Sequence, residues 1–273
     1  MFELLNQPFI ISALVVSLVM GLLLSYLGVH VVRRGIVFVD LALGQISMLG
    51  VAFAAFIETE PFLISIVFTM AGAFLLSFIN VKDPRLKAEA LIGIVYAVAS
   101  AVTVLLISKA PHGDADISEV LFGSLFTVTN EQLMIMAIVF AAIGLLHFIF
   151  RTKFFDLTQK FQNHQAEDIG KFNFWNFTFY LTIGLAIVLA VRAGGVIPVF
   201  SYLIVPPVAA IMFSKRNSLV IILSIILSAI GSFFGIYFSV QFDFPAGSSI
   251  VAMLGVIFTV AIISNMLNSS RNS

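Results

Sequence analysis

The chain has 273 residues, is 60% hydrophobic and only 10% charged, and carries a formal net charge of zero. Its mean hydropathy is +1.12, whereas a soluble domain is about half apolar and about a quarter charged. This composition excludes a water-soluble fold of this length and suggests no nucleic-acid partner. The sequence contains no cysteine, which excludes disulfides, thiolate metal sites and cysteine nucleophiles.

Long uncharged apolar segments predict nine membrane-spanning α-helices. A spanning helix needs about 20 largely apolar residues, and its backbone polar groups must be bonded within the segment. The apolar segments are continuous and do not alternate, which argues against a β-barrel. We therefore expect an all-α, polytopic integral membrane protein with a single transmembrane domain over residues 1–273. The predicted helices lie near residues 9–31, 36–57, 62–81, 90–108, 132–150, 174–191, 195–213, 218–238 and 247–267.

The positions of lysine and arginine predict the orientation of these helices. Positive charge collects in the cytoplasmic loops of bacterial-type membrane proteins. If the connection that contains Arg33 and Arg34 is cytoplasmic, only Lys109 and Arg192 of the 14 basic residues fall on the outer side. The nine-helix topology then places the N-terminus outside and the C-terminus inside the cytoplasmic membrane of a prokaryote.

Two connections are longer than a turn: an outer loop of about residues 109–131 and an inner loop of about residues 151–172. Long loops in compact proteins are usually functional or disordered. The inner loop mixes phenylalanines with charged residues, which suits a helix that lies at the membrane surface or docks on a soluble partner. A simple amphipathic linker is the alternative interpretation.

Four sequence blocks occur in a characteristic order. They are RRGIVFVDLALGQISMLG at residues 33–50, EALIGIVY at 89–96, LFGSL at 121–125 and GVIPVFSYLIVPPVAA at 195–210. In their order and spacing the blocks resemble the metal-type permease family of ABC importers, which serves zinc, manganese and iron uptake. The resemblance spans most of the chain.

The resemblance implies a transmembrane domain similar to the metal and cobalamin/siderophore permeases. It implies a permease subunit that moves a divalent cation across the membrane by alternating access, without a cofactor. The implied partners are a second permease copy, a cytoplasmic ATPase subunit and an external or periplasmic metal-binding protein, in a lipid membrane. The ATPase would dock on the inner loop, where Asp156, Ala166 and Gly170 are the candidate coupling residues.

Asp40 and Gln45 are the candidate metal-pathway residues, because an ionisable group in a spanning helix is costly unless it faces water, a partner or a cation. Asp40 could instead pair with Arg33 or Arg34 at the interface. The family places a histidine four residues after its aspartate. Here Gln45 follows Asp40 by five residues, which turns the two side chains about 140° apart on a helix. Matching from Gly50 backwards keeps Gln45 but puts Leu41 in the place of the aspartate.

The fourth block supplies the candidate pathway helix, with Gly195, Ser201, Pro206 and Pro207 as its notable residues. The two prolines remove backbone donors inside an apolar helix, which kinks or opens it and leaves carbonyls facing a cavity or a neighbouring helix. A kink that only shapes packing is the competing interpretation.

The chain contains no Gly-rich phosphate loop followed by Lys and Ser or Thr, and no hydrolase or zinc-protease signature. We therefore expect no enzyme activity, and ATP hydrolysis on a separate subunit. Lone His30 and His147 are interpreted as hydrogen-bonded or interfacial groups. Three alternatives remain: a secondary carrier, which needs more intramembrane carboxylates than Asp40; an intramembrane enzyme, which needs clustered polar groups; and a permease of the same fold with a non-metal substrate.

Overall fold

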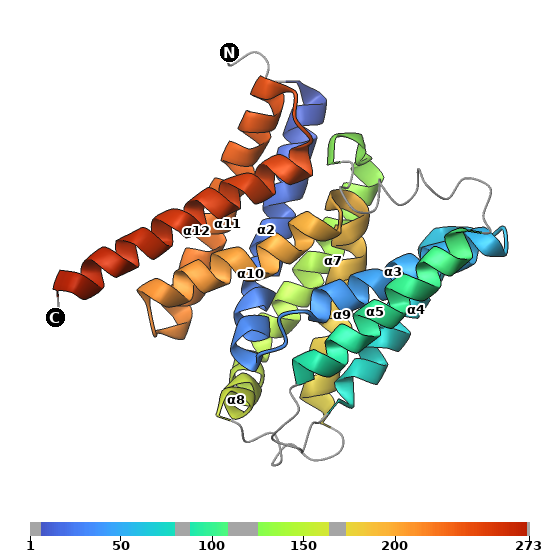
Figure 1. The fold of residues 1–273 in the computed structure, drawn as a ribbon, viewed down its shortest axis with the longest axis horizontal. Coiled ribbons are helices and arrows are strands. Elements are labelled where there is room, and N and C mark those ends of the chain that lie inside the picture. Colours follow the sequence, from blue (N-terminus) through green and yellow to red (C-terminus); the bar gives the residue numbers. More distant parts are fainter. Residues whose placement is uncertain (1–6, 80–87, 109–124, 164–172, 272–273) are drawn as a thin grey trace. The chain divides into compact units, whose positions relative to one another are not determined.

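The computed structural model describes residues 7–79, 88–108, 125–163 and 173–271 (Figure 1). Within these residues all regular structure is helical, as expected where backbone groups must be bonded inside their own segment. In chain order the elements are α2 Pro8–Arg34, α3 Val39–Phe56, α4 Pro61–Ser77, α5 Ala88–Ile107, the short 3-10 helix η1 Leu125–Thr127, α7 Asn130–Ile149, α8 Arg151–Gln162, α9 Phe174–Gly194, α10 Val196–Phe213, α11 Asn217–Phe242 and α12 Ala246–Arg271.

The nine predicted apolar helices are all found among the described residues. Eight helices are long and apolar enough to cross a membrane, and α4 is a shorter apolar helix of 17 residues. The all-α polytopic fold is therefore confirmed. The largest boundary differences are at the C-terminal ends of α4, which ends at Ser77, of α11, which continues to Phe242, and of α12, which continues to Arg271. The sequence prediction ends α11 at residue 238 because polar residues follow. The helix continues through them and ends where Asp243 takes a left-handed conformation with φ 56°.

Contacts divide the chain into two compact units, each built from separated segments. Unit 1 comprises the described residues of Met1–Val32, Phe122–Ile138 and Ala193–Ser273, which include most of α2, η1, the first part of α7, α10, α11 and α12. The last two residues of α2 and the rest of α7 belong to unit 2. Unit 2 comprises the described residues of Arg33–Leu121 and Val139–Arg192, which include α3, α4, α5, α8 and most of α9.

In unit 1, the helix α10 contains two prolines, and α2 packs closely beside them. An α-helix bonds each N–H to the carbonyl four residues earlier, so Pro207 leaves the carbonyl of Leu203 without its usual donor. Gly28 of α2 faces this place. A Cβ on Gly28 would overlap the Leu203 oxygen and would lie 2.8 Å from Cγ of Pro207. The missing side chain of Gly28 therefore lets α2 approach the opened turn of α10.

Buried hydroxyl groups also join the helices of unit 1. The hydroxyl of Tyr202 on α10 is hydrogen-bonded to that of Ser232 on α11, and Ser232 donates to the carbonyl of Ser17 on α2 at 3.3 Å. All three residues are buried. Hydrophobic attraction between helices is weak in lipid, so such bonds and small residues help to hold a bundle together.

In unit 2, α3 packs against α4 and α5. A Cβ on Gly50 of α3 would lie 2.8 Å from Cα of Ser65 on α4, which shows that the two backbones approach closely there. Gly72 of α4 in turn receives the side chain of Ile46 of α3. These glycines place the first block of the sequence beside α4.

We predict that Gly28→Ala destabilises the protein by about 1–3 kcal/mol, because the added methyl group meets a backbone carbonyl that cannot rotate away. The matched control is Gly255→Ala on α12 of the same unit, where a Cβ has open space. Thermal unfolding, followed by size-exclusion chromatography in detergent, should give a lower midpoint temperature for Gly28→Ala. The midpoint of Gly255→Ala should equal that of the unchanged protein. Equal midpoints for Gly28→Ala and the unchanged protein would contradict the packing described for α2 and α10.

Candidate functional site

Asp40 is buried in the first turn of α3. Its side chain is 2% exposed, and among the described residues neither carboxylate oxygen has a hydrogen-bond partner of good geometry. Weaker contacts with the backbone amides of Asp40 and Leu41 remain, and the N-terminus of a helix favours negative charge. A carboxylate in this position marks a functional candidate, because a charge inside a membrane protein is costly without a partner.

The arginines that precede α3 do not supply that partner. In the described part of the chain Asp40 has no hydrogen bond to Arg33 or Arg34. Arg34 Nε instead donates to Thr158 Oγ1 at 3.0 Å, and Arg34 Nη1 donates to Asn176 Oδ1 at 3.2 Å. The geometry therefore does not support the interfacial ion pair, and the pathway role of Asp40 stays a prediction.

Gln45 is also buried, with 8% of its side chain exposed. Because α3 is one continuous helix from Val39 to Phe56, the five residues between Asp40 and Gln45 turn their side chains about 140° apart. The two residues do not share one helical face. Across the described ranges, no group of three or more His, Asp or Glu side chains is close enough to hold a metal ion.

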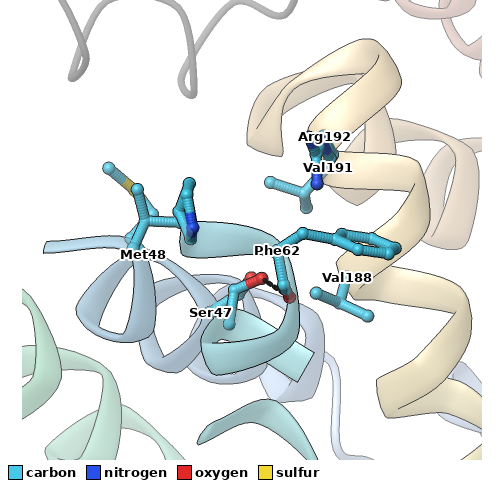
Figure 2. A pocket seen from close by; sticks show the side chains of 9 residues that line it. Ser47, Met48, Phe62, Val188, Val191 and Arg192 are labelled. Carbon is cyan, nitrogen blue, oxygen red and sulfur yellow. Dashed lines mark hydrogen bonds between the residues drawn. The ribbon is translucent and has the colours of Figure 1, made fainter. Parts of the chain in front are cut away.

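A small pocket of about 160 Å³ lies in unit 2 between α3, α4 and α9 (Figure 2). Figure 2 shows Ser47 and Met48 on one side of this pocket, and Val188, Val191 and Arg192 on the other. The guanidinium of Arg192 lies 4.5 Å from the centre of the Phe62 ring, and Ser65 Oγ donates to the Phe62 carbonyl at 2.8 Å. Neither Asp40 nor Gln45 lines the pocket. The sequence patterns did not predict it, because most of its lining residues are ordinary apolar types. The complete lining is Ser47, Met48, Val51, Pro61, Phe62, Ser65, Val188, Val191 and Arg192.

The inner loop begins with the helix α8, which has two distinct faces. Phe154, Leu157 and Thr158 are buried, whereas Asp156 is exposed. This pattern agrees with the amphipathic helix expected in the inner loop. Two of the coupling candidates, Ala166 and Gly170, lie outside the described residues. Asp156 is the candidate that the structure places on an accessible face.

Aromatic and polar contacts attach the buried face of α8 to α7 and α9. The imidazole of His147 stacks on Phe154 at 3.9 Å between ring centres and is hydrogen-bonded to Thr182 at 2.9 Å. The ring of Trp175 meets Phe154 edge to face at 5.7 Å. His147 is therefore a hydrogen-bonded structural group, as interpreted from the sequence. The hydroxyl of Tyr26 likewise lies 3.2 Å from the ring nitrogen of His30 in unit 1.

The pathway-helix candidates of the fourth block belong to unit 1. Gly195 precedes α10 with φ 83°, a left-handed conformation that glycine adopts without strain. Ser201 is buried and donates to the carbonyl of Ile197 at 2.9 Å, so its hydroxyl is satisfied within its own helix. Pro206 and Pro207 are buried inside α10. In this structure Pro207 lies beside Gly28, which gives this proline a packing role.

Comparisons with known proteins agree along nearly the whole chain. A family model described as the ABC 3 transport family matches residues 6–265. The manganese transport system membrane protein MntC of Listeria monocytogenes is 27% identical over 94% of this chain and 91% of that protein. The manganese import system permease protein ScaB of Streptococcus gordonii is 27% identical over 93% of this chain and 90% of that protein. The solved structure of PsaBC from Streptococcus pneumoniae in complex with Fab is similar with a TM-score of 0.78 and 26% identity, over 95% of this chain and 93% of that chain.

Proposed function

The chain belongs to the ABC 3 transport family, and from this membership we propose that it is the permease subunit of an ATP-driven importer of divalent metal cations. The membership confirms the resemblance carried by the four sequence blocks. The observation that carries the proposal is the near-full-length similarity to two permeases named for manganese transport. The buried carboxylate of Asp40 supports the proposal, because a carboxylate without a hydrogen-bond partner among the described residues is suited to interact with a cation.

We propose manganese as the first candidate substrate, ahead of zinc and iron. Asp40 offers a carboxylate oxygen, a hard ligand of the kind that suits Mn²⁺. Zinc sites are built more often from histidine and cysteine, and this chain has no cysteine and has Gln45 where the family has its histidine. Two permease copies around one pathway would contribute the carboxylate of Asp40 twice, which would offset the small number of ligands in one chain.

The proposed complex contains two further components. A cytoplasmic ATPase subunit docks on the exposed face of α8 at Asp156, with the nearby Ala166 and Gly170 as additional candidates. An external metal-binding protein delivers the cation. Closure of the ATPase pair moves α8, and the membrane helices pass between outward-open and inward-open states. Gly195, Ser201, Pro206 and Pro207 of α10 are the proposed pathway helix.

The proposed orientation has the N-terminus outside and α8 on the cytoplasmic side. Because the chain has no cysteine, single cysteines report their own location. We predict that an impermeant thiol reagent applied to intact cells labels Thr59→Cys and Phe244→Cys but labels Gln159→Cys only after the membrane is opened. Positions 59, 159 and 244 are all exposed in the structure. Labelling of position 159 from outside would overturn the orientation.

We predict that Asp40→Asn lowers metal uptake per inserted molecule by about tenfold or more, which corresponds to about 1.4 kcal/mol or more. The substitution removes the charge and keeps the size. Asp243→Asn serves as the matched control, because Asp243 is exposed and asparagine tolerates its left-handed conformation. The measurement is uptake of radioactive manganese, normalised to the permease present in the membrane. Normal uptake with reduced abundance would assign Asp40 a structural role.

Gln45→His supplies the complementary arm of that experiment. An imidazole at this position should raise zinc uptake relative to manganese if Gln45 faces the pathway, because nitrogen ligands suit zinc. Unchanged preference in this variant, together with normal uptake by Asp40→Asn, would remove α3 from the pathway.

We predict that Asp156→Lys reduces copurification of the ATPase subunit, because the substitution reverses the charge on the exposed face of α8. Glu131→Lys is the control, since it makes the same reversal at an exposed position in the first turn of α7. Membrane abundance of both variants should equal that of the unchanged protein. Full copurification with Asp156→Lys would exclude this face of α8 from the interface.

A further inference from the structure

Besides the aromatic contacts of Phe154, one arginine side chain joins α8 to α9 in unit 2. Arg34 is the last residue of α2, is 7% exposed and contacts two residues of each of two other helices. On α8 it donates to Thr158 at 3.0 Å and lies 5.5 Å from the ring centre of Phe161. On α9 it donates to Asn176 at 3.2 Å and lies 3.8 Å from the ring centre of Phe179.

The arrangement is regular on both helices. Thr158 and Phe161 are three residues apart, as are Asn176 and Phe179, so each pair forms one hydrogen-bond acceptor and one aromatic ring on the same helical face. Arginine suits such a place because its planar guanidinium donates in two directions while its face stacks on a ring. A lysine carries the same charge but has neither the fork nor the flat face.

The contact continues into the membrane helices through Asn176. Its amide nitrogen Nδ2 donates to the carbonyl of Ser77 at the end of α4, at 3.1 Å. The side chain of Asn173 accepts bonds from the backbone N–H groups of Trp175 and Asn176, which fixes the first turn of α9. Arg34 and Asn176 therefore connect α8 with the adjoining ends of α9 and α4.

We propose that Arg34, Thr158 and Asn176 form a latch that transmits movement of α8 to the membrane helices, with Arg34 as the positioning residue. This proposal rests on the proposed function of α8 as the ATPase-docking helix. Asp156 is exposed and Thr158 is buried, so one face of α8 meets the ATPase while the opposite face holds the latch. Loss of the latch should leave docking intact and weaken the link between ATP hydrolysis and transport.

The central variant is Thr158→Val, which removes the hydroxyl at nearly constant volume. In the complex of permease and ATPase reconstituted in vesicles, we expect it to raise the number of ATP molecules hydrolysed per metal ion imported by about threefold or more. Membrane abundance and copurification of the ATPase should match the unchanged complex. Thr158→Ser keeps the hydroxyl and should restore the ratio, and Arg34→Lys should raise it further.

Arg216→Lys is the matched control, because Arg216 is exposed and is remote in sequence from the latch. It should leave the ratio unchanged. An unchanged ratio in both Thr158→Val and Arg34→Lys would overturn the proposal. The proposal would also be overturned if ATP hydrolysis and metal import fell equally, so that the number of ATP molecules per imported ion stayed constant. That result would mean that the contacts only maintain the fold.

A second measurement separates the latch from the proposed substrate. Hydrogen exchange of the detergent-solubilised complex, with and without a non-hydrolysable ATP analogue, needs no metal. We expect nucleotide to change exchange in both α8 and the first two turns of α9, and we expect Thr158→Val to abolish the change in α9 while α8 still responds. If this holds but the complex imports no metal, the substrate assignment fails and the latch stands. If metal is imported and α9 responds equally in both proteins, the latch fails and the importer stands.

Discussion

Inside hydrocarbon, every backbone N–H and carbonyl must find a partner within the protein. This constraint makes the described residues helical, and it makes each interruption of a helix informative. Pro206 and Pro207 interrupt the bonding of α10, and the carbonyl of Leu203 loses its donor as a result. The structure places Gly28 against that carbonyl, so the opened turn is covered by the backbone of a neighbouring helix in the same unit.

Buried polar side chains need partners for the same reason. Two charged residues only six positions apart, Arg34 and Asp40, differ in whether they have them. Arg34 is buried, and it is surrounded by two hydrogen-bond acceptors and two aromatic rings. Asp40 is equally buried, yet its carboxylate has no hydrogen-bond partner of good geometry among the described residues. The arginine with these acceptors and rings around it suits a structural link, and the carboxylate suits the pathway role proposed for it.

Arg34 and Asp40 have different proposed roles in this member of the ABC 3 transport family: Arg34 in the latch and Asp40 in the cation pathway. In the proposed importer, the ATPase acts at the cytoplasmic surface, while the cation passes between the membrane helices. The amphipathic helix α8 presents charge outward and aromatic rings inward, and its inward face contacts α9 through Trp175 and Arg34. In the two proposals, the first block of the sequence supplies both Arg34 of the latch and Asp40 of the pathway.

Local sequence determined the helices, because apolar composition and backbone bonding act within one segment. The nine apolar helices and the amphipathic inner helix could be predicted in this way. The competing ion pair of Asp40 with Arg34 could not be decided, since it depends on where Thr158 and Asn176 lie, more than 120 residues away from Arg34 in the chain. The partners of Pro207 and the pocket beside Phe62 also came only from the tertiary structure. Helical periodicity states which residues share a face, but only packing between distant segments decides which buried polar groups meet one another.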